Sequence, residues 1–162
     1  MHYLENINDV LNKILMFVGS IAVLFLMSLA TVNVCLRFFL NAPYRGAYEL
    51  VGFSGAIVIA FALGYTQKRK DHIVVDILTE KFPKRAIQAL NAISYFIMMV
   101  FFTVMAWQVW VWGMKIAKSG EVSETLKIMF HPVIFGVSFG FAVFSLTLLI
   151  DFLKTIRGTE ES

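Results

Sequence analysis

The chain of 162 residues is 59% hydrophobic and only 15% charged, and its mean hydropathy is +0.75. Because ordinary soluble domains carry about 25% charged residues, this composition excludes that class and predicts a membrane protein. The formal net charge of +3 suits contact with a lipid bilayer that carries anionic headgroups, and it gives no reason to expect binding to nucleic acid.

The charged residues are confined to short intervals. Uncharged runs of 23, 18, 29 and 23 residues separate Lys13 from Arg37, Glu49 from Lys68, Arg85 from Lys115 and Lys127 from Asp151. A helix needs about 20 apolar residues to cross the hydrocarbon core of a bilayer. The sequence therefore predicts an all-α membrane protein of one domain, with four transmembrane helices at about 14–38, 47–67, 86–112 and 130–153.

The first predicted element is amphipathic. Apolar residues recur at helical spacing near the N-terminus (Leu4, Ile7, Leu11 and Ile14), with polar residues between them. This pattern predicts a short helix that lies at the membrane interface before the first span. The apolar run that follows is too long for the core of a signal peptide and lacks a convincing small-residue cleavage site, so we expect it to be retained as a span.

The connection between the first two spans is short and contains the turn residues Asn41, Pro43 and Gly46. Arg37 precedes this connection by about one helical turn, and Glu49 follows it by about one turn. In a tight helical hairpin the two side chains reach a similar depth, where a charge is stabilised by an opposite charge. The sequence predicts an Arg37–Glu49 ion pair; the alternative is that each side chain extends separately to water.

Small residues recur at every fourth position of the second span, and two more are spaced by four in the last span. They are Gly52, Ala56, Ala60 and Gly64, followed by Gly136 and Gly140. Such residues let two helix backbones approach closely, which is how helices associate in lipid. We expect a helix-packing or subunit-contact surface here, although Gly and Ala are also simply common in membrane helices.

The connection between the second and third spans carries the heaviest basic load of the chain: Lys68, Arg69, Lys70, Lys81, Lys84 and Arg85. Within it, residues 71–82 alternate apolar and polar side chains with helical period, which predicts a short amphipathic helix on the membrane surface. His72 and Asp76 share its polar face. Two such groups four residues apart could contact another subunit, bind a metal or relay a proton. Two ligands alone make a weak metal site, and a solvated polar face is the simpler interpretation.

The distribution of basic residues predicts the orientation. With four spans, the two termini and the basic connection lie on one side, which holds nine of the Lys and Arg residues, while the other side holds five. Cytoplasmic loops carry the excess of positive charge, so both termini are expected in the cytoplasm. Trp107, Trp110 and Trp112 at the end of the third span then mark the opposite membrane boundary.

The sequence offers little for chemistry within the membrane. The centre of every span is free of Asp, Glu, Lys, Arg and His, whereas ion-coupled transport sites usually need such groups or a broken helix. His2, His72 and His131 lie near span ends, which does not suit axial ligation of haem, and Cys35 is the single cysteine. We expect no cofactor, no metal and no enzymatic activity. The alternatives are a small homo-oligomeric transporter or channel, and the membrane anchor of a redox enzyme.

Four stretches together resemble one known family. They are Asn33-Val-Cys-Leu-Arg37, Pro43-Tyr-Arg-Gly-Ala-Tyr-Glu49, Tyr65-Thr-Gln-Lys-Arg-Lys-Asp-His72-Ile-Val-Val-Asp76 and Phe82-Pro83. Their residues, order and spacing resemble the small, DctQ-like membrane subunit of the tripartite ATP-independent periplasmic (TRAP) transporters.

The resemblance implies a bacterial inner-membrane subunit without an active site of its own. In that family a periplasmic substrate-binding protein captures an organic anion, often a carboxylate or a sugar acid. A large, DctM-like membrane subunit moves the anion inward, driven by an ion gradient that is typically of sodium. The resemblance implies that the small subunit braces the large one and helps to dock the binding protein.

Overall fold

The computed structural model describes residues 2–41, 44, 46–69 and 84–157. These residues form four long helices: α1 (His2–Leu40), α2 (Ala47–Lys68), α4 (Lys84–Ser119) and α5 (His131–Ile156). All four are long and apolar enough to cross a membrane, which confirms the predicted all-α membrane fold. The interfacial helix predicted at 71–82, with His72 and Asp76, lies outside the described residues.

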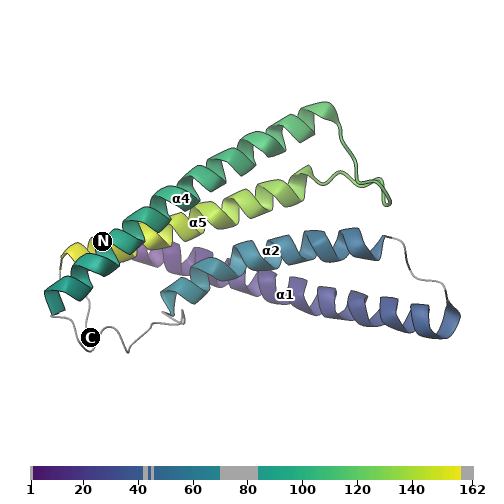
Figure 1. The fold of residues 1–162 in the computed structure, drawn as a ribbon, viewed down its shortest axis with the longest axis horizontal. Helices are drawn as coiled ribbons and strands as arrows, with labels where there is room; N and C mark the ends of the chain where they lie inside the picture. The colour runs from purple at the N-terminus through teal and green to yellow at the C-terminus, as the bar shows by residue number, and fades with distance from the viewer. Residues whose placement is uncertain (1, 42–43, 45, 70–83, 158–162) are drawn as a thin grey trace.

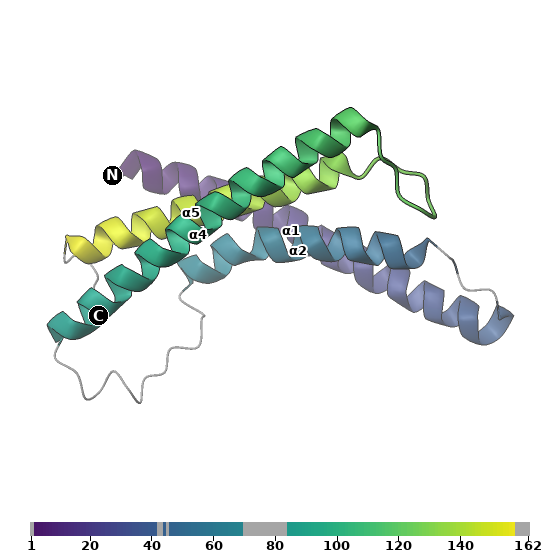
Figure 2. The same ribbon diagram turned by 45° about the horizontal axis from the view of Figure 1, so that its top comes forward.

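The helices form two antiparallel hairpins, α1 with α2 and α4 with α5 (Figure 1). The hairpins meet through α5, which packs against α2 and to a lesser extent against α1. They converge at the end where α1 begins and α5 finishes, called here the terminal end. They separate toward the opposite end, called here the loop end, where residues 41–46 and 120–130 connect the helices of each hairpin (Figures 1 and 2).

Helix α1 is much longer than a bilayer requires. Its 39 residues span about 58 Å at about 1.5 Å per residue, whereas the hydrocarbon core is about 30 Å thick. The N-terminal residues continue this helix without a break, so the expectation of a separate interfacial helix before the first span is wrong. The reason is local: residues 2–18 contain neither Pro nor Gly, and nothing there ends a helix.

The amphipathic start of α1 is arranged with its polar side inward. Asn8 and Asn12 are almost completely buried, while the apolar residues Leu4, Ile7 and Val10 are about half exposed. In a water-soluble helix the opposite arrangement is usual. In this protein the polar groups find partners on α2 and α5, and the apolar side chains face the surroundings of the bundle.

Described residues of both connections at the loop end adopt turn conformations or make contacts back to the chain. Asn41 has a φ of 48° at the end of α1, and the side-chain oxygen of Asn33 accepts a 3.0 Å hydrogen bond from the backbone of Tyr44. The second connection, the 120–130 loop, begins at Gly120 with a φ of 69° and folds back on itself through an antiparallel bridge between Val122 and Met129. Tyr44 is thereby joined to α1, and the 120–130 loop is closed on itself.

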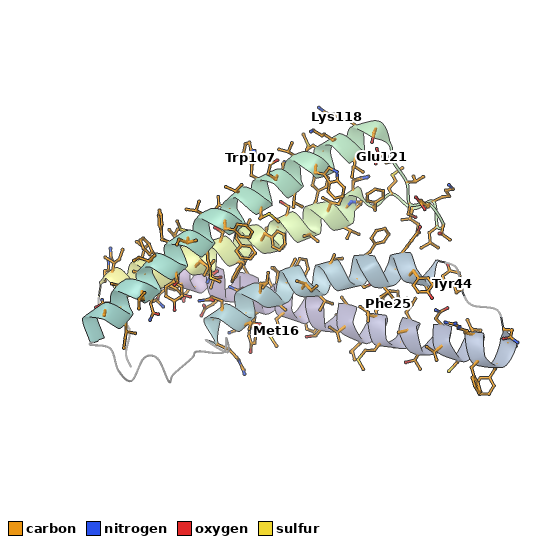
Figure 3. The ribbon with its side chains drawn as sticks, in the orientation of Figure 1. Met16, Phe25, Tyr44, Trp107, Lys118 and Glu121 are labelled. Atoms are coloured by element: carbon orange, nitrogen blue, oxygen red, sulfur yellow. The ribbon has the colours of Figure 1, made fainter. Side chains whose placement is uncertain are left out.

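The core of the molecule lies along α5. Leu148, Phe144 and Val143 are buried there, and the ring of Phe102 on α4 packs edge-on against Phe144 with 4.5 Å between ring centroids. Helix α4 covers only one side of α5, and none of its most apolar 18-residue stretch is buried. Trp107 projects from the side of α4 that faces away from α5 (Figure 3). This broad apolar surface suits lipid or other membrane helices.

Candidate interaction sites

Glu49 joins the two hairpins at the loop end. It lies in the first turn of α2, and its two carboxylate oxygens accept hydrogen bonds from the backbone N–H groups of Thr125 (2.8 Å) and Leu126 (3.1 Å) in the 120–130 loop. Hydrogen bonds to an ionised acceptor are stronger than neutral ones. One side chain of the α1–α2 hairpin therefore holds the loop of the α4–α5 hairpin.

Two apolar contacts lie beside Glu49 and hold the same loop. The side chain of Leu126 covers Gly46, where any Cβ atom would overlap the leucine methyl groups. The ring of Phe53 on α2 stacks on Phe130 at the start of α5, with 6.0 Å between the centroids and 11° between the planes. The loop is thus fixed by polar and apolar contacts together, and a side chain at position 46 would require Leu126 to move.

Arg37 lies in the last turn of α1, and its side chain is exposed. Among the described residues, no ion pair joins it to Glu49, whose carboxylate instead binds the 120–130 loop. The Arg37–Glu49 pair stays a prediction. The partner that the structure gives Glu49 lies 76 residues away in the sequence, where no local pattern could indicate it.

A buried polar cluster, made of Asn8, Asn12 and Thr147, joins α1 to α5 toward the terminal end. The side-chain amide of Asn12 donates to the backbone oxygen of Asn8 (2.9 Å), to its side-chain oxygen (3.0 Å) and to the hydroxyl of Thr147 (3.2 Å). The Thr147 hydroxyl in turn donates to Asn8 or to the backbone of Val143. Gly64 of α2 packs directly against the side-chain oxygen of Asn12, so three helices meet here.

Charged and amide side chains extend this polar region to the helix ends. Asp9 pairs with Lys68 at 2.5 Å, and Glu5 pairs with Lys154 at 3.2 Å. Further polar contacts join α2 to α5 and α4 to α5: Gln67 donates to Asp151 at 3.0 Å, and Gln88 donates to the backbone oxygen of Thr155 at 2.5 Å. The start of α1 is therefore bound to both α2 and α5.

The small residues of α2 and α5 lie in different surroundings. Ala60 and Gly140 face one another, and a Cβ at Gly140 would lie 2.8 Å from the backbone oxygen of Ala60. Gly64 contacts Asn12, as described above, and Gly136 lies near the ring of Phe61, which a Cβ would approach to 3.9 Å. Ala56 borders a cavity between the hairpins, and Gly52 is exposed, so that a Cβ there would meet no atom within 4 Å.

The described residues contain no group of three or more His, Cys, Asp and Glu side chains that could hold a metal ion. Their polar contacts include hydrogen bonds within single helices as well as the contacts between elements described above, and the predicted interfacial pair of His72 and Asp76 lies outside the described residues. A second cavity, of about 220 Å³, lies between α1 and α2 and is bordered by apolar residues that include Phe25, near the connection that carries Tyr44 (Figure 3).

Four apolar helices of this length define a multi-pass membrane protein. A family model described as "Tripartite ATP-independent periplasmic transporters, DctQ component" matches residues 11–158. The chain belongs to this family and is a small membrane subunit of a TRAP transporter. Searches among curated proteins and among solved structures gave no significant match.

Sequence reasoning missed two of the places where the hairpins are joined, namely the contact of Glu49 with the 120–130 loop and the polar cluster. The spacing of Asn8 and Asn12 indicates only the polar side of an amphipathic helix, and it does not reveal that Thr147 lies opposite. A usable signal was present nonetheless: Asn12, Gly64 and Thr147 are each polar or small residues near the same end of three apolar helices. In a membrane helix such residues mark contacts between helices.

Proposed function

We propose that this chain is the non-catalytic small subunit of a secondary-active uptake system in a bacterial inner membrane. A large, DctM-like membrane subunit moves organic anions such as carboxylates or sugar acids inward, and an ion gradient, of sodium in this proposal, drives it. The small subunit braces the large one and helps to dock the periplasmic substrate-binding protein. Membership of the DctQ family is the observation that carries the proposal.

The absence of ionisable groups from the span centres supports a bracing role. A subunit that coupled ion movement to transport would usually carry such groups or a broken helix near the middle of the membrane. The charged residues of this sequence lie toward the span ends or between the spans. Instead, the hairpins are joined by the Glu49 contact, the Ala60–Gly140 contact and the polar cluster, as a rigid brace requires.

The charge distribution supports an orientation with both termini in the cytoplasm. The side with the termini and the basic connection between the second and third spans holds nine Lys and Arg residues against five on the other side. The loop end then faces the periplasm. Because Glu49 and Phe53 hold the 120–130 loop in place, that loop offers a preformed surface to a binding protein, with little ordering cost on association.

Co-purification and reconstitution test the proposal. A tagged chain expressed from its own operon should co-purify with a large multi-span subunit. In vesicles, uptake from a panel of labelled carboxylates and sugar acids should require that subunit, the binding protein and a sodium gradient. The small subunit alone should give no uptake above that of protein-free vesicles.

Three results would contradict the proposal. Uptake by the purified chain alone, as a homo-oligomer measured by mass in lipid, would make it a self-sufficient transporter. A haem absorption band that stays with the purified protein would make it a redox anchor. Uptake by the large subunit and the binding protein that is unchanged when the small subunit is omitted would remove the bracing role.

A further inference from the structure

A cavity of about 320 Å³ lies between the two hairpins on the loop side of the molecule. Its walls come from α2, α4 and the start of α5, and no polar atom is exposed on them. The lining residues include Phe53 and Ala56 of α2, Val109 and Trp112 of α4, and Ile134 and Val137 of α5. Helices α2 and α4 pack against α5 but make no extensive contact with each other over their described residues, so the cavity occupies the space where the hairpins separate.

The cavity lies within the hydrocarbon part of the spans. Phe53 is one turn past Glu49, and Val109 is six residues before Lys115, so the lining begins where the charged residues end. At the inner boundary, the Ala60–Gly140 contact brings the hairpins together. The cavity therefore spans the loop-side leaflet, between the headgroup region and the closest approach of the two helices.

Ordered water is not expected to fill this apolar cavity. At about 30 Å³ per molecule the volume would take about ten waters, and each needs two to four polar partners that an apolar wall does not provide. An empty space of this size would leave its lining without dispersion contacts on one side. The cavity therefore requires an apolar occupant, and a membrane offers two kinds: a helix from another subunit or an acyl chain of a lipid.

The position of the cavity favours the acyl chain. The cavity opens to the surroundings of the bundle between α2 and α4, where acyl chains of the bilayer reach it directly. An acyl chain is narrow and flexible and can enter lengthwise, whereas a helix about 10 Å across would have to enter with its side chains.

The residues at the loop-side margin of the cavity are of the kind that contact a phospholipid headgroup. Trp112 lines the cavity and is still 54% exposed, and indole rings prefer the headgroup level. Lys115 is exposed and lies three residues further along α4, so it is next to Trp112 on the same face of the helix. Its ammonium group would meet a phosphate that lies above the cavity.

We propose that the cavity is a binding site for a phospholipid of the loop-side leaflet, with one acyl chain between α2 and α4 and the phosphate beside Lys115. The chain fills the space that the diverging hairpins leave and completes their packing. The proposal requires only that the protein spans a membrane, and it is independent of the transported solute.

Retention of lipid by substituted proteins tests the proposal. The full chain, with any co-purifying subunits, is reconstituted with phosphatidylethanolamine and phosphatidylglycerol, extracted in mild detergent and analysed by native mass spectrometry. Each wild-type chain should keep one phospholipid. Ala56→Phe fills the cavity and should lower the retained lipid by about tenfold, because several buried methylene groups lose their contacts. Ile59→Phe places the same ring on the exposed side of α2, where Ile59 is 64% exposed, and should leave retention unchanged.

A second measurement does not depend on how the Ala56 variant folds. Two proteins keep a single Trp each, Trp112 in the cavity or Trp107 on the outer side of α4, with the other tryptophans replaced by Phe. Both are loaded with lipid that carries a spin label on the acyl chain, and then diluted into excess unlabelled lipid. Quenching should persist at Trp112 and disappear on mixing at Trp107, which is 70% exposed.

Loss of quenching at the same rate at both positions would overturn the proposal. So would equal lipid retention in the Ala56→Phe and Ile59→Phe proteins. The occupant would be a partner helix if, in the assembled complex, no lipid were retained and a photoreactive residue at Val137 crosslinked to another subunit.

Discussion

Asn12 illustrates how a single polar residue can join three membrane helices. Its amide nitrogen has acceptors on α1 and α5, but its side-chain oxygen is buried and has no hydrogen-bond partner among the described residues. A Cβ at Gly64 would overlap that oxygen, so a Cα hydrogen of Gly64 points at it. A weak Cα–H···O contact of about 0.5–1 kcal/mol offsets part of the cost of about 1–3 kcal/mol for an unsatisfied buried acceptor.

Gly64→Ala should therefore lower the free energy of unfolding by about 1–3 kcal/mol, because the new methyl group displaces the Asn12 amide and its hydrogen bonds. Unfolding of the purified protein by a denaturing detergent, followed by circular dichroism, measures this loss. Gly52→Ala is the matched control, since Gly52 is exposed in the same helix with open space around it, and it should be nearly neutral.

The double substitution Asn12→Ala with Gly64→Ala separates overlap from a general effect of the methyl group. When Asn12 is already alanine, the methyl at position 64 meets no oxygen, so the further cost of Gly64→Ala should fall by about 0.5–3 kcal/mol. Strictly additive losses would show that Gly64 does not act through Asn12.

At the scale of helices, the contact between α2 and α5 depends on Gly140. A Cβ there would lie 2.8 Å from the backbone oxygen of Ala60 and 3.0 Å from its Cβ, and neither atom can rotate away. Gly140→Ala should force the two helices apart and cost about 1–3 kcal/mol in the free energy of unfolding. Gly136→Ala, on the same helix, meets the ring of Phe61 at 3.9 Å and should be tolerated. Equal losses in the two variants would exclude close backbone approach as the reason for the small residue at 140.

The number and type of these helices could be predicted because uncharged runs of 18 to 29 residues have few other uses. The ends of α1 and α4 could not be predicted, because these two helices continue beyond the apolar runs, to His2 and Ser119. The direction of the polar side of α1 could not be predicted either. Amphipathic spacing distinguishes two sides of a helix but does not say which one meets the rest of the bundle, and the partners Thr147 and Lys154 are distant in sequence.

At the scale of the whole molecule, the two hairpins are joined in separate places that resist different motions. The polar cluster with its adjoining ion pairs holds the terminal end, and Ala60 with Gly140 holds the middle. Toward the loop end the hairpins diverge, and the contacts of the 120–130 loop with Glu49 and Phe53 bridge the separation. Opening of the loop end is therefore resisted mainly by this one loop.

Glu49→Ala should widen the loop end without changing the terminal end. Spin labels at Phe39 of α1 and Lys118 of α4, in a Cys35→Ser background because Cys35 is exposed, report the separation of the hairpins near the loop. Their distance distribution should broaden and shift to longer values in Glu49→Ala, since the loop loses both hydrogen bonds. Labels at Lys13 and Leu90, both exposed near the terminal end, should be unaffected.

The same labels test the predicted role of Arg37. If Arg37 pairs with Glu49 in the membrane, Arg37→Gln should also broaden the distribution at the loop end, because the pair would help to fix the carboxylate that holds the loop. If Glu49 acts through the loop backbone alone, Arg37→Gln should match the unsubstituted protein while Glu49→Ala does not. An unchanged distribution in Glu49→Ala would mean that Leu126 on Gly46 and Phe53 on Phe130 suffice to hold the loop, and that the carboxylate is not what joins the hairpins there.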